Sequence, residues 1–318
     1  MPHKNDNLTV LGAGVLGAQI AWHSAYKGKQ VVVYDLFDEA LERCKQHHQQ
    51  YAEQYKLDLG ASDADMQVTQ TRVRYTSDLA DAVANADVVI EAVPEIPDVK
   101  KDLYSKLAPL LPEHTIVASN SSTLLPSMFA EYTGRPEKFC ALHFANLIWM
   151  SNLAEIMAHP GTARETLEQI TEFAIEIGMV PIAVQKEQNG YLLNTWLVAL
   201  LNSAQTLVTN GVGTPEDVDR TFLIINRGAQ MGPFGIMDVV GIKTCFDILS
   251  HWGEVNNDDQ MRKNAAYYKE HFLDQGKQGM LGGEGYYKYP NPAFAQEGFL
   301  DVPDKSVVSS IVERTSFK

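Results

Sequence analysis

Two kinds of apolar pattern alternate along the first half of the chain. Short apolar runs, several rich in valine and isoleucine, predict buried strands at residues 8–11, 30–34, 88–92, 115–119 and 139–143. Between these runs, apolar residues recur at helical spacing, which predicts helices at residues 15–27, 37–57 and 99–111. A turn at Gly60 favours a helical hairpin, with a second short helix before Val73. Strands that alternate with helices are typical of a parallel sheet covered on both faces.

The pattern changes after residue 187. Two more strand-like runs, at residues 153–157 and 181–184, are expected to extend the sheet after the chain reverses direction. Beyond them only helical patterns follow, interrupted by glycine and proline, and the last residues, after about 301, are expected to form a loose tail or an extra helix. We therefore predict an α/β domain over residues 1–187 and a smaller, all-helical C-terminal domain over residues 188–318.

Length, composition and charge narrow the class of protein. The 318 residues suit two domains, and 45% hydrophobic residues suffice for two cores. The formal net charge of −14 gives no general attraction to nucleic acid or to an anionic membrane, so neither partner is expected. Three scattered cysteines suit neither a disulfide framework nor a metal site. With no recognisable leader peptide or membrane span, we expect a cytoplasmic protein without a metal.

A glycine-rich motif follows the first predicted strand. It has the form G-x-G-x-x-G and consists of Gly12, Ala13, Gly14, Val15, Leu16 and Gly17. In such motifs the glycines allow a tight turn, the approach of a pyrophosphate to the backbone, and close packing of helix on strand. The N-terminus of the following helix then presents free N–H groups to the phosphates.

An aspartate after the second predicted strand complements this motif. Asp35 lies 18 residues after Gly17, where a carboxylate accepts hydrogen bonds from the adenosine ribose and repels a 2′-phosphate. The alternative is a glycine turn and a solvated aspartate without any nucleotide. Strand, glycines, helix and acid together favour a Rossmann-type domain that binds NAD.

One histidine is well placed for catalysis. His143 ends the apolar run of residues 139–143, and the carboxyl ends of parallel strands face the ligand crevice in such a fold. Glu155 lies within the apolar run of residues 153–157, where a buried carboxylate needs a partner, and a histidine is a natural one. A purely structural histidine is the alternative.

Further motifs resemble the L-3-hydroxyacyl-CoA dehydrogenase family, including its short-chain 3-hydroxybutyryl-CoA members. The resemblance runs from Leu8 to about Tyr289. The matching segments are S-N-x-S at residues 119–122, H-F-x-N at 143–146, apolar-x-E-apolar at 153–156, the helix asparagine at Asn194, G-P-x-G-x-x-D-x-x-G at 232–241 and G-E-G-[FY]-Y-K-Y at 283–289. Ala92, Glu95 and Lys100 match the family's cofactor stretch.

The resemblance implies NAD-dependent oxidation of the 3-hydroxyl of a short-chain acyl-CoA, or the reverse reduction. It implies that His143 takes the hydroxyl proton and that Glu155 orients the imidazole. It also implies that Ser122 and Asn194 bind the substrate oxygens, although a turn serine and a packing asparagine are the alternatives. The residues that it places along the cofactor are Ala92, Glu95, Lys100, Asn120 and Asn146.

The chain departs from the family pattern around the expected substrate pocket. Ala145 replaces an aromatic residue, Leu147 replaces a proline, and Thr195 replaces an arginine. Met280-Leu281 stands where the family has basic residues. These departures leave open a second interpretation, a dehydrogenase of a free hydroxy acid, such as gulonate or carnitine, on the same fold. A third is a non-catalytic NAD-binding protein, against which the retained catalytic residues argue.

Self-association is also expected. The helical run of residues 191–208 carries large apolar side chains on nearly all sides, and one domain core can cover only some of them. A second subunit is the simplest cover for the rest, and the family resemblance also implies a homodimer. The other expected partner is a small-molecule substrate.

We predict at least a tenfold preference for NAD over NADP in kcat/KM. Asp35 is followed by Leu36-Phe37, so no adjacent cation neutralises a 2′-phosphate, and such a clash costs more than about 1.4 kcal/mol. Steady-state kinetics with both cofactors measure the ratio. Equal kcat/KM values would contradict the role given to Asp35.

Overall fold

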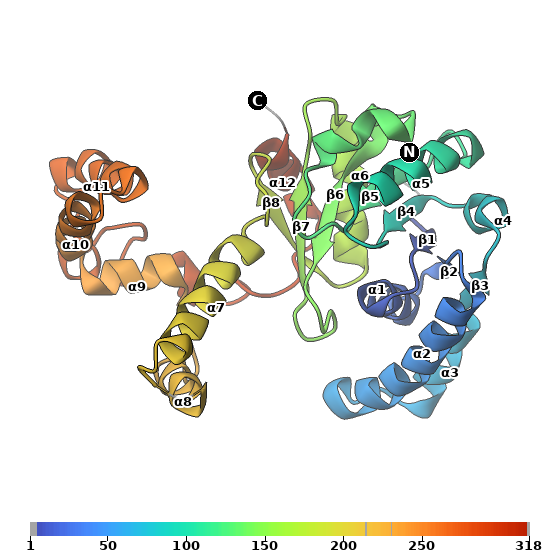
Figure 1. Cartoon of the computed structure of the whole chain (residues 1–318), viewed down its shortest axis with the longest axis horizontal. Coiled ribbons are helices and arrows are strands. Elements are labelled where there is room, and N and C mark those ends of the chain that lie inside the picture. Colours follow the sequence, from blue (N-terminus) through green and yellow to red (C-terminus); the bar gives the residue numbers. More distant parts are fainter. Residues whose placement is uncertain (1–4, 214, 230, 317–318) are drawn as a thin grey trace. The chain divides into compact units, whose positions relative to one another are not determined.

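The chain forms two compact units in a computed structural model that describes residues 5–213, 215–229 and 231–316 (Figure 1). The first unit consists of Met1–Ser203 and Val302–Lys318, and the second of Ala204–Asp301. Among the described residues, the helices are all too short or too polar to cross a membrane.

The first unit is built on one sheet of eight strands. In the order in which they pair, these are β3 (Val73–Thr76), β2 (Gln30–Tyr34), β1 (Asn7–Leu11), β4 (Val88–Glu91), β5 (Ile116–Ser119), β6 (Phe139–Phe144), β7 (Leu153–Met157) and β8 (Val180–Val184). Strands β1 to β6 are parallel, β7 is antiparallel to β6, and β8 is parallel to β7. The order 3-2-1-4-5-6 is that of a Rossmann fold, which confirms the predicted fold class.

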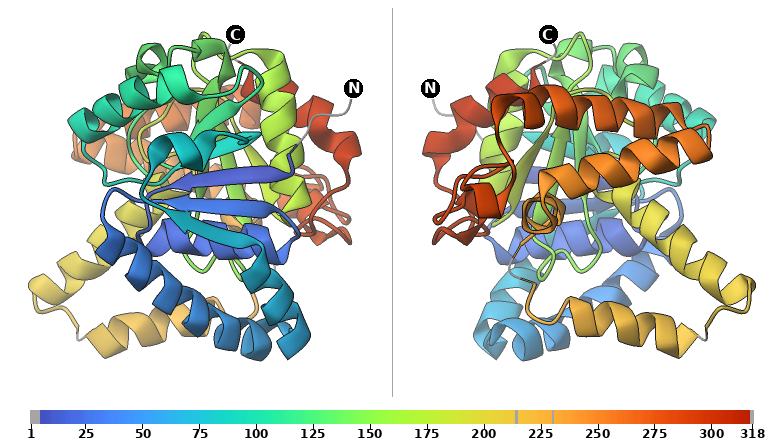
Figure 2. Two further views of the ribbon diagram at one scale, coloured as in Figure 1. Left: turned by 90° about the vertical axis from the view of Figure 1, so that its right-hand side faces the viewer. Right: turned by 90° about the vertical axis from the view of Figure 1, so that its left-hand side faces the viewer.

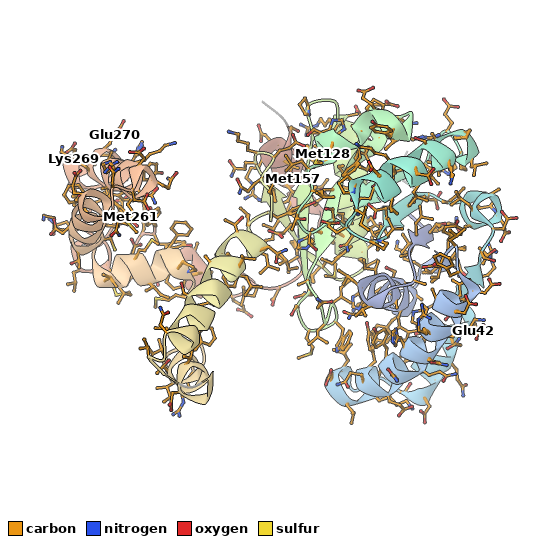
Figure 3. All side chains as sticks on the ribbon, in the orientation of Figure 1. Glu42, Met128, Met157, Met261, Lys269 and Glu270 are labelled. Carbon is orange, nitrogen blue, oxygen red and sulfur yellow. The ribbon has the colours of Figure 1, made fainter. Side chains whose placement is uncertain are left out.

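Helices cover both faces of this sheet (Figures 1 and 2). One face packs against α1 (Val15–Tyr26), α2 (Asp38–Leu59), α3 (Asp63–Thr71), α6 (Arg164–Glu176) and α12 (Val308–Thr315). The other face packs against α4 (Leu79–Val83) and α5 (Pro97–Leu107). Neighbouring strand residues therefore enter different cores: Ile90 lies in the first and Val89 in the second. Figure 3 shows the side chains on this framework.

The expected helical hairpin is formed by α2 and α3, and two buried histidines link α2 to strand β3 and to helix α1. Nδ1 of His48 in α2 lies 2.6 Å from the hydroxyl of Tyr75 in β3, and Nδ1 of His23 in α1 lies 2.8 Å from the hydroxyl of Tyr55. Burial lowers the pKa of each histidine to about 4. Both rings are therefore neutral structural groups at physiological pH.

The strands predicted from apolar runs are all present, whereas β3, α4 and α6 were not predicted. Strand β3 has only four residues, two of them polar, and it pairs with β2 alone at the edge of the sheet. An edge strand buries little surface, so its sequence carries a weak signal. Short 3-10 helices occupy several connections, at Ala108–Leu110, Pro126–Met128, Ala130–Thr133, Pro136–Lys138, Leu273–Gln275, Met280–Gly282, Ala293–Ala295 and Lys305–Val307.

The second unit is helical, as predicted. It contains α8 (Pro215–Ile225), α9 (Pro233–Val240), α10 (Ile242–Val255) and α11 (Asp259–His271). Its core gathers around Ile242, Tyr268 and Phe272. The division between the units falls within α7 (Leu193–Thr209).

Two glycine-rich segments of the second unit meet at a buried carboxylate. Asp238 of α9 accepts hydrogen bonds from the backbone N–H groups of Tyr286 and Tyr287, both at 2.9 Å, and from the Tyr289 hydroxyl at 3.0 Å. A Cβ atom at Gly285 would lie 2.0 Å from Oδ1 of Asp238, so only glycine fits there. The segments 232–241 and 283–289 therefore stabilise one another.

The observed division differs from the predicted boundary after residue 187. It falls at Ser203, and the residues from Val302 onward return to the first unit instead of belonging to the helical one. There α12 packs against α6 and β8 through Val308, Ile311 and Val312, which are buried. This apolar stripe at helical spacing explains why the expected tail is a helix docked on the first unit.

Candidate active site

A histidine and a glutamate meet across β6 and β7. His143 and Glu155 are directly opposite partners in this antiparallel pair, so their side chains share one face of the sheet. Nδ1 of His143 lies 2.9 Å from Oε2 of Glu155, and both side chains are buried. Because an ionised carboxylate only accepts hydrogen bonds, Nδ1 is the donor, and Nε2 of the neutral ring carries a free lone pair.

The second oxygen of Glu155 binds backbone N–H groups at the N-terminus of α7. Oε1 accepts hydrogen bonds from the backbone N–H groups of Leu192 at 2.9 Å and Leu193 at 3.0 Å. Leu193 is the first residue of α7, so the carboxylate lies at the positive end of the helix dipole. These donors compensate for the burial of the charged group.

The structure brings the two predicted substrate-binding residues together. Asn194 lies in the first turn of α7, directly after Leu193, and its Nδ2 atom donates to the carbonyl oxygen of Ser122 at 3.3 Å. Ser122 is half-buried in the loop that follows β5. The predicted residues Ser122, His143, Glu155 and Asn194 therefore form one chain of neighbours.

The loop that carries Ser122 is held by Glu95. Oε1 of Glu95 accepts hydrogen bonds from the hydroxyl of Ser121 at 2.5 Å, from the N–H of Ser122 at 3.0 Å, and from the N–H and hydroxyl of Thr123, both at 2.9 Å. Burial alone would raise the pKa of Glu95, but these hydrogen bonds and the charge of Lys100 outweigh burial and lower the pKa to about 2.

Lys100 is buried between two carboxylates. Its Nζ atom lies 2.7 Å from Oε1 of Glu91 and 3.2 Å from Oε2 of Glu95. Glu91 also accepts hydrogen bonds from the hydroxyls of Tyr104 and Ser119, both at 2.7 Å. Glu91 was not predicted, although it is a carboxylate at the end of the apolar run of β4 and a buried carboxylate needs a partner, as at Glu155. The contact of Lys100 and Glu95 with a nicotinamide ribose stays a prediction.

The glycine motif leaves room for a dinucleotide. Gly12 has a φ of 109°, and a Cβ atom there would lie 2.5 Å from the carbonyl oxygen of Ala92. A Cβ atom at Gly17 would lie 2.0 Å from the carbonyl oxygen of Gly12, so both glycines are required by packing. At Gly14, by contrast, a Cβ atom would meet nothing within 4 Å, and no side chain caps α1, which begins at Val15. Open space beside an uncapped helix N-terminus fits a pyrophosphate.

Asp35 is oriented by the same turn. Its Oδ2 atom accepts a hydrogen bond from the N–H of Ala13 at 2.9 Å, and its Oδ1 atom accepts one from the N–H of Phe37 at 3.1 Å. The carboxylate is thus held beside the glycine motif, where a ribose diol is expected. Val15 is exposed and Leu16 is half-buried at the start of α1.

The two predicted asparagines occupy different positions at the ends of the strands. Asn120 is buried after β5, and its Oδ1 atom accepts a hydrogen bond from the N–H of Phe144 at 3.0 Å, which links β5 to β6. Asn146 is exposed in the loop that follows β6. Their contacts with the cofactor stay predictions.

The loop after β6 has a backbone that the family's proline would not allow. Leu147 has a φ of 57°, whereas proline is fixed near −65°. Oε1 of Gln19 in α1 accepts hydrogen bonds from the N–H groups of Leu147 at 2.7 Å and Ile148 at 3.4 Å. Nε1 of Trp149 donates to Asp58 in α2 at 2.8 Å. The loop that connects β6 to β7 is therefore held by hydrogen bonds to α1 and α2.

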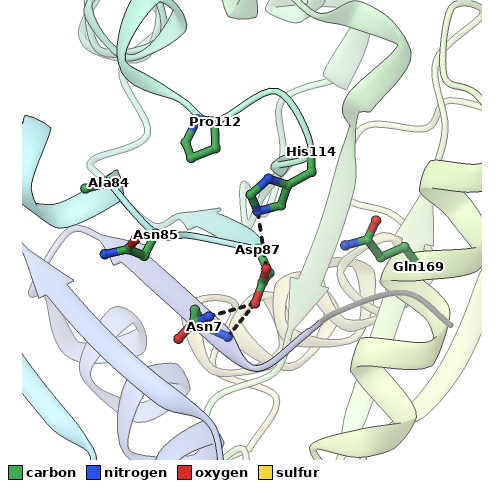
Figure 4. A pocket seen from close by; sticks show the side chains of 7 residues that line it. All are labelled: Asn7, Ala84, Asn85, Asp87, Pro112, His114 and Gln169. Atoms are coloured by element: carbon green, nitrogen blue, oxygen red, sulfur yellow. Dashed lines mark hydrogen bonds and ion pairs between the residues drawn. The ribbon is translucent and has the colours of Figure 1, made fainter. Parts of the chain in front are cut away.

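A cavity of about 500 Å³ lies at the amino-terminal ends of strands β1, β4 and β5, at the other end of the strands from the glycine motif (Figure 4). It is lined by Asn7, Ala84, Asn85, Asp87, Pro112, His114 and Gln169. Asp87 accepts hydrogen bonds from the backbone and side chain of Asn7, and Nε2 of His114 lies 3.3 Å from Asp87. Apart from Gln169 of α6, these residues precede β1, β4 and β5 or begin them, so the cavity is separate from the carboxyl ends of the strands, where the dinucleotide is expected. Nowhere in the described residues do three or more histidine, cysteine, aspartate or glutamate side chains gather to hold a metal ion.

A Rossmann-type domain with an acidic residue after its second strand and a buried histidine–glutamate pair defines the class of NAD-dependent dehydrogenases. Residues 7–188 match the NAD-binding domain of 3-hydroxyacyl-CoA dehydrogenase, and residues 190–289 match the C-terminal domain of the same enzyme. The chain belongs to the 3-hydroxyacyl-CoA dehydrogenase family, which confirms the resemblance stated above. It is an NAD-dependent oxidoreductase.

Individual relatives cover most of the chain. The mitochondrial hydroxyacyl-coenzyme A dehydrogenase of Homo sapiens is 31% identical over 89% of this chain and 91% of its own. A probable 3-hydroxybutyryl-CoA dehydrogenase of Deinococcus radiodurans is 32% identical over 88% of this chain and 99% of its own. Among solved structures, a diketoreductase described as acting on dicarbonyl compounds is 48% identical, with a TM-score of 0.66 over 89% of this chain and 98% of its own.

We predict that Glu95→Gln lowers the unfolding temperature at neutral pH and that this difference shrinks in acid. The folded-state pKa of Glu95 is lowered to about 2, so its stabilising contribution is complete above the unfolded value of about 4.3 and is lost as the pH falls toward 2. Thermal unfolding of both proteins between pH 7 and pH 2.5 measures the difference. Glu297→Gln, at an exposed glutamate, is the control. An equal difference at all pH values would contradict the prediction.

Proposed function

We propose that the protein catalyses NAD-dependent oxidation of the 3-hydroxyl of a short-chain acyl-CoA, or the reverse reduction, with His143 as the general base. The observation that supports this most strongly is the buried contact of 2.9 Å between His143, near the end of β6, and Glu155, in the middle of β7. When bound, NAD supplies the hydride acceptor for the carbon that carries the hydroxyl.

The proton is handled by the histidine–glutamate pair. Nε2 of His143 takes the hydroxyl proton because Nδ1 is already protonated and donates to Glu155. Glu155 then stabilises the imidazolium, while the N–H groups of Leu192 and Leu193 hold the carboxylate in place. In the reductive direction the imidazolium returns the proton to the carbonyl oxygen.

The remaining residues bind and orient the substrate and the cofactor. Ser122 and Asn194, which contact one another, hold the substrate oxygens beside His143. Asp35 and the glycine motif bind the adenosine half of the cofactor. Glu95, Lys100 and Asn146 line the nicotinamide ribose, and Ala92 and Asn120 complete the set of cofactor-binding residues.

A second candidate function is the reduction of a free dicarbonyl compound or the oxidation of a free hydroxy acid. The 48% identity to a diketoreductase favours it. The phosphates of an acyl-CoA also require cations, and four of the basic side chains described in the second unit already pair with carboxylates: Lys243 with Asp247, Arg262 with Asp259, Lys269 with Asp274, and Lys277 with Glu284.

We also propose a homodimer in the cytoplasm. Support for self-association comes from exposed apolar side chains on α8 and α9, among them Phe222, Ile225 and Phe234. On α7, Trp196 and Val198 are exposed, whereas the side chains of Leu201 and Val208 lie outside the described residues.

A comparison of substrates decides between the two candidate functions. We predict that acetoacetyl-CoA supports NADH oxidation with a kcat/KM at least tenfold above that of free acetoacetate and of a free dicarbonyl ester. The reason is that contacts with the CoA portion are expected to stabilise the transition state, and the free compounds lack this portion. NADH absorbance measures each rate. A preference for the free dicarbonyl compounds would establish the second function and overturn the first.

We predict that His143→Ala lowers kcat by roughly 10²–10⁴-fold, because proton transfer is lost, and leaves NAD affinity nearly unchanged. Glu155→Gln keeps the shape but loses the charge, so it also lowers kcat severely. Because the two residues act as one unit, the double variant loses far less than the product of the single losses. Fully multiplicative losses, or a His143→Ala enzyme within threefold of the parent, would mean that the base is another residue.

A further inference from the structure

The turn before α7 contacts both members of the catalytic pair. Residues Leu192 and Leu193 donate their N–H groups to Glu155, as described above. The residue before them, Tyr191, places its ring on the imidazole of His143, with ring centroids 4.8 Å apart and an angle of 27° between the planes. One short segment therefore touches the pair from two directions.

Tyr191 is held firmly in this position. Its side chain is fully buried and packs against Ala141 of β6, Met157 of β7 and Val184 of β8. These residues line the face of the sheet to which His143 and Glu155 also belong, because residues two apart on a strand share a face. The ring therefore fills the space directly beside the imidazole.

The backbone at Tyr191 is unusual for a residue with a side chain. Its φ is 54°, in the left-handed region that favours glycine, so the conformation needs support from its surroundings. Thr195, which replaces the family's arginine, gives that support: its hydroxyl donates to the carbonyl oxygen of Tyr191, and its N–H donates to that of Gly190 at 3.2 Å. The departure at residue 195 thus stabilises the turn that presents the ring.

The two parts of the Tyr191 side chain differ in the partners that they have. The hydroxyl is buried, and it has no hydrogen-bond partner among the described residues. The ring, in contrast, has a defined partner in His143. Because only the ring has a partner, the roles of the ring and of the hydroxyl can be tested by separate substitutions.

We propose that Tyr191 is a positioning residue for the reaction: its ring, stacked on His143, keeps the imidazole in the plane in which Nδ1 meets Glu155 and Nε2 faces the substrate. Glu155 fixes one nitrogen but leaves the ring free to tilt about that hydrogen bond, and the stacked ring opposes this tilt. The hydroxyl has no part in this role. The inference rests on the proposed function of His143 as the base.

Two substitutions at Tyr191 test the proposal. Tyr191→Phe keeps the ring and removes a buried hydroxyl without a partner, so we expect kcat within twofold of the parent and an equal or higher unfolding temperature. Tyr191→Leu removes the aromatic ring, and we expect kcat to fall roughly tenfold while KM and NAD affinity change less than threefold. Val184→Ala, which opens the same apolar cluster beside the ring, is the control for lost packing and should leave kcat within twofold.

The same substitution in a His143→Ala background shows whether Tyr191 acts through the histidine. Tyr191→Leu should then have no further effect on kcat. A persistent tenfold loss, or a Tyr191→Leu enzyme with the parent's kcat, would overturn the proposal. A tenfold rise in KM with Tyr191→Phe would overturn it too, because the hydroxyl would then bind the substrate. Failure of the proposed function is distinguishable, since His143→Ala alone would then retain activity.

Discussion

A buried carboxylate must be surrounded by hydrogen-bond donors, and at Glu155 this requirement determines where three separate segments lie. Strand β7 must run antiparallel to β6 to bring Glu155 opposite His143. Helix α7 must begin at Leu193 so that its first N–H groups reach the second oxygen. These contacts fix the turn that leads into α7, and in this turn the ring of Tyr191 stacks on the imidazole of His143. The geometry of the candidate base is therefore a property of the backbone as much as of side-chain packing.

The same use of acidic side chains recurs away from Glu155. Glu91 joins α5 to the ends of β4 and β5, Glu95 gathers the loop that carries Ser122, and Asp238 joins two glycine-rich segments of the second unit. Each carboxylate has two oxygens and accepts from several backbone or hydroxyl donors at once, so it can hold a loop that has no regular secondary structure. In a chain with a net charge of −14, some of the acids thus organise the interior instead of solvating the surface.

The sequence predicted most of the sheet, because strands buried on both faces leave continuous apolar runs. It also indicated that His143 and Glu155 belong together, because an acid within an apolar run needs a partner. The edge strand β3 was not predicted because it buries little, and Glu91 was not predicted because a single acid at the end of an apolar run is also typical of a solvated strand end. The left-handed backbone of Leu147 and Tyr191 could not be foreseen, since neither residue favours it and distant contacts impose it. The docking of α12 on the first unit was not predicted either, because it depends on contacts with α6 and β8, which are far away in the sequence.

The return of residues 302–318 makes the helical unit an insertion in the chain of the NAD-binding unit, instead of an appendage at its end. The first unit is complete only after the whole helical unit has been synthesised, because α12 then supplies Val308, Ile311 and Val312 to the core beside α6 and β8. During translation the emerging NAD-binding unit therefore leaves this part of its core uncovered until α12 has been synthesised. A shortened chain that ends at Tyr289 would leave the apolar side chains beside α6 and β8 exposed permanently, where other unfolded chains could bind them.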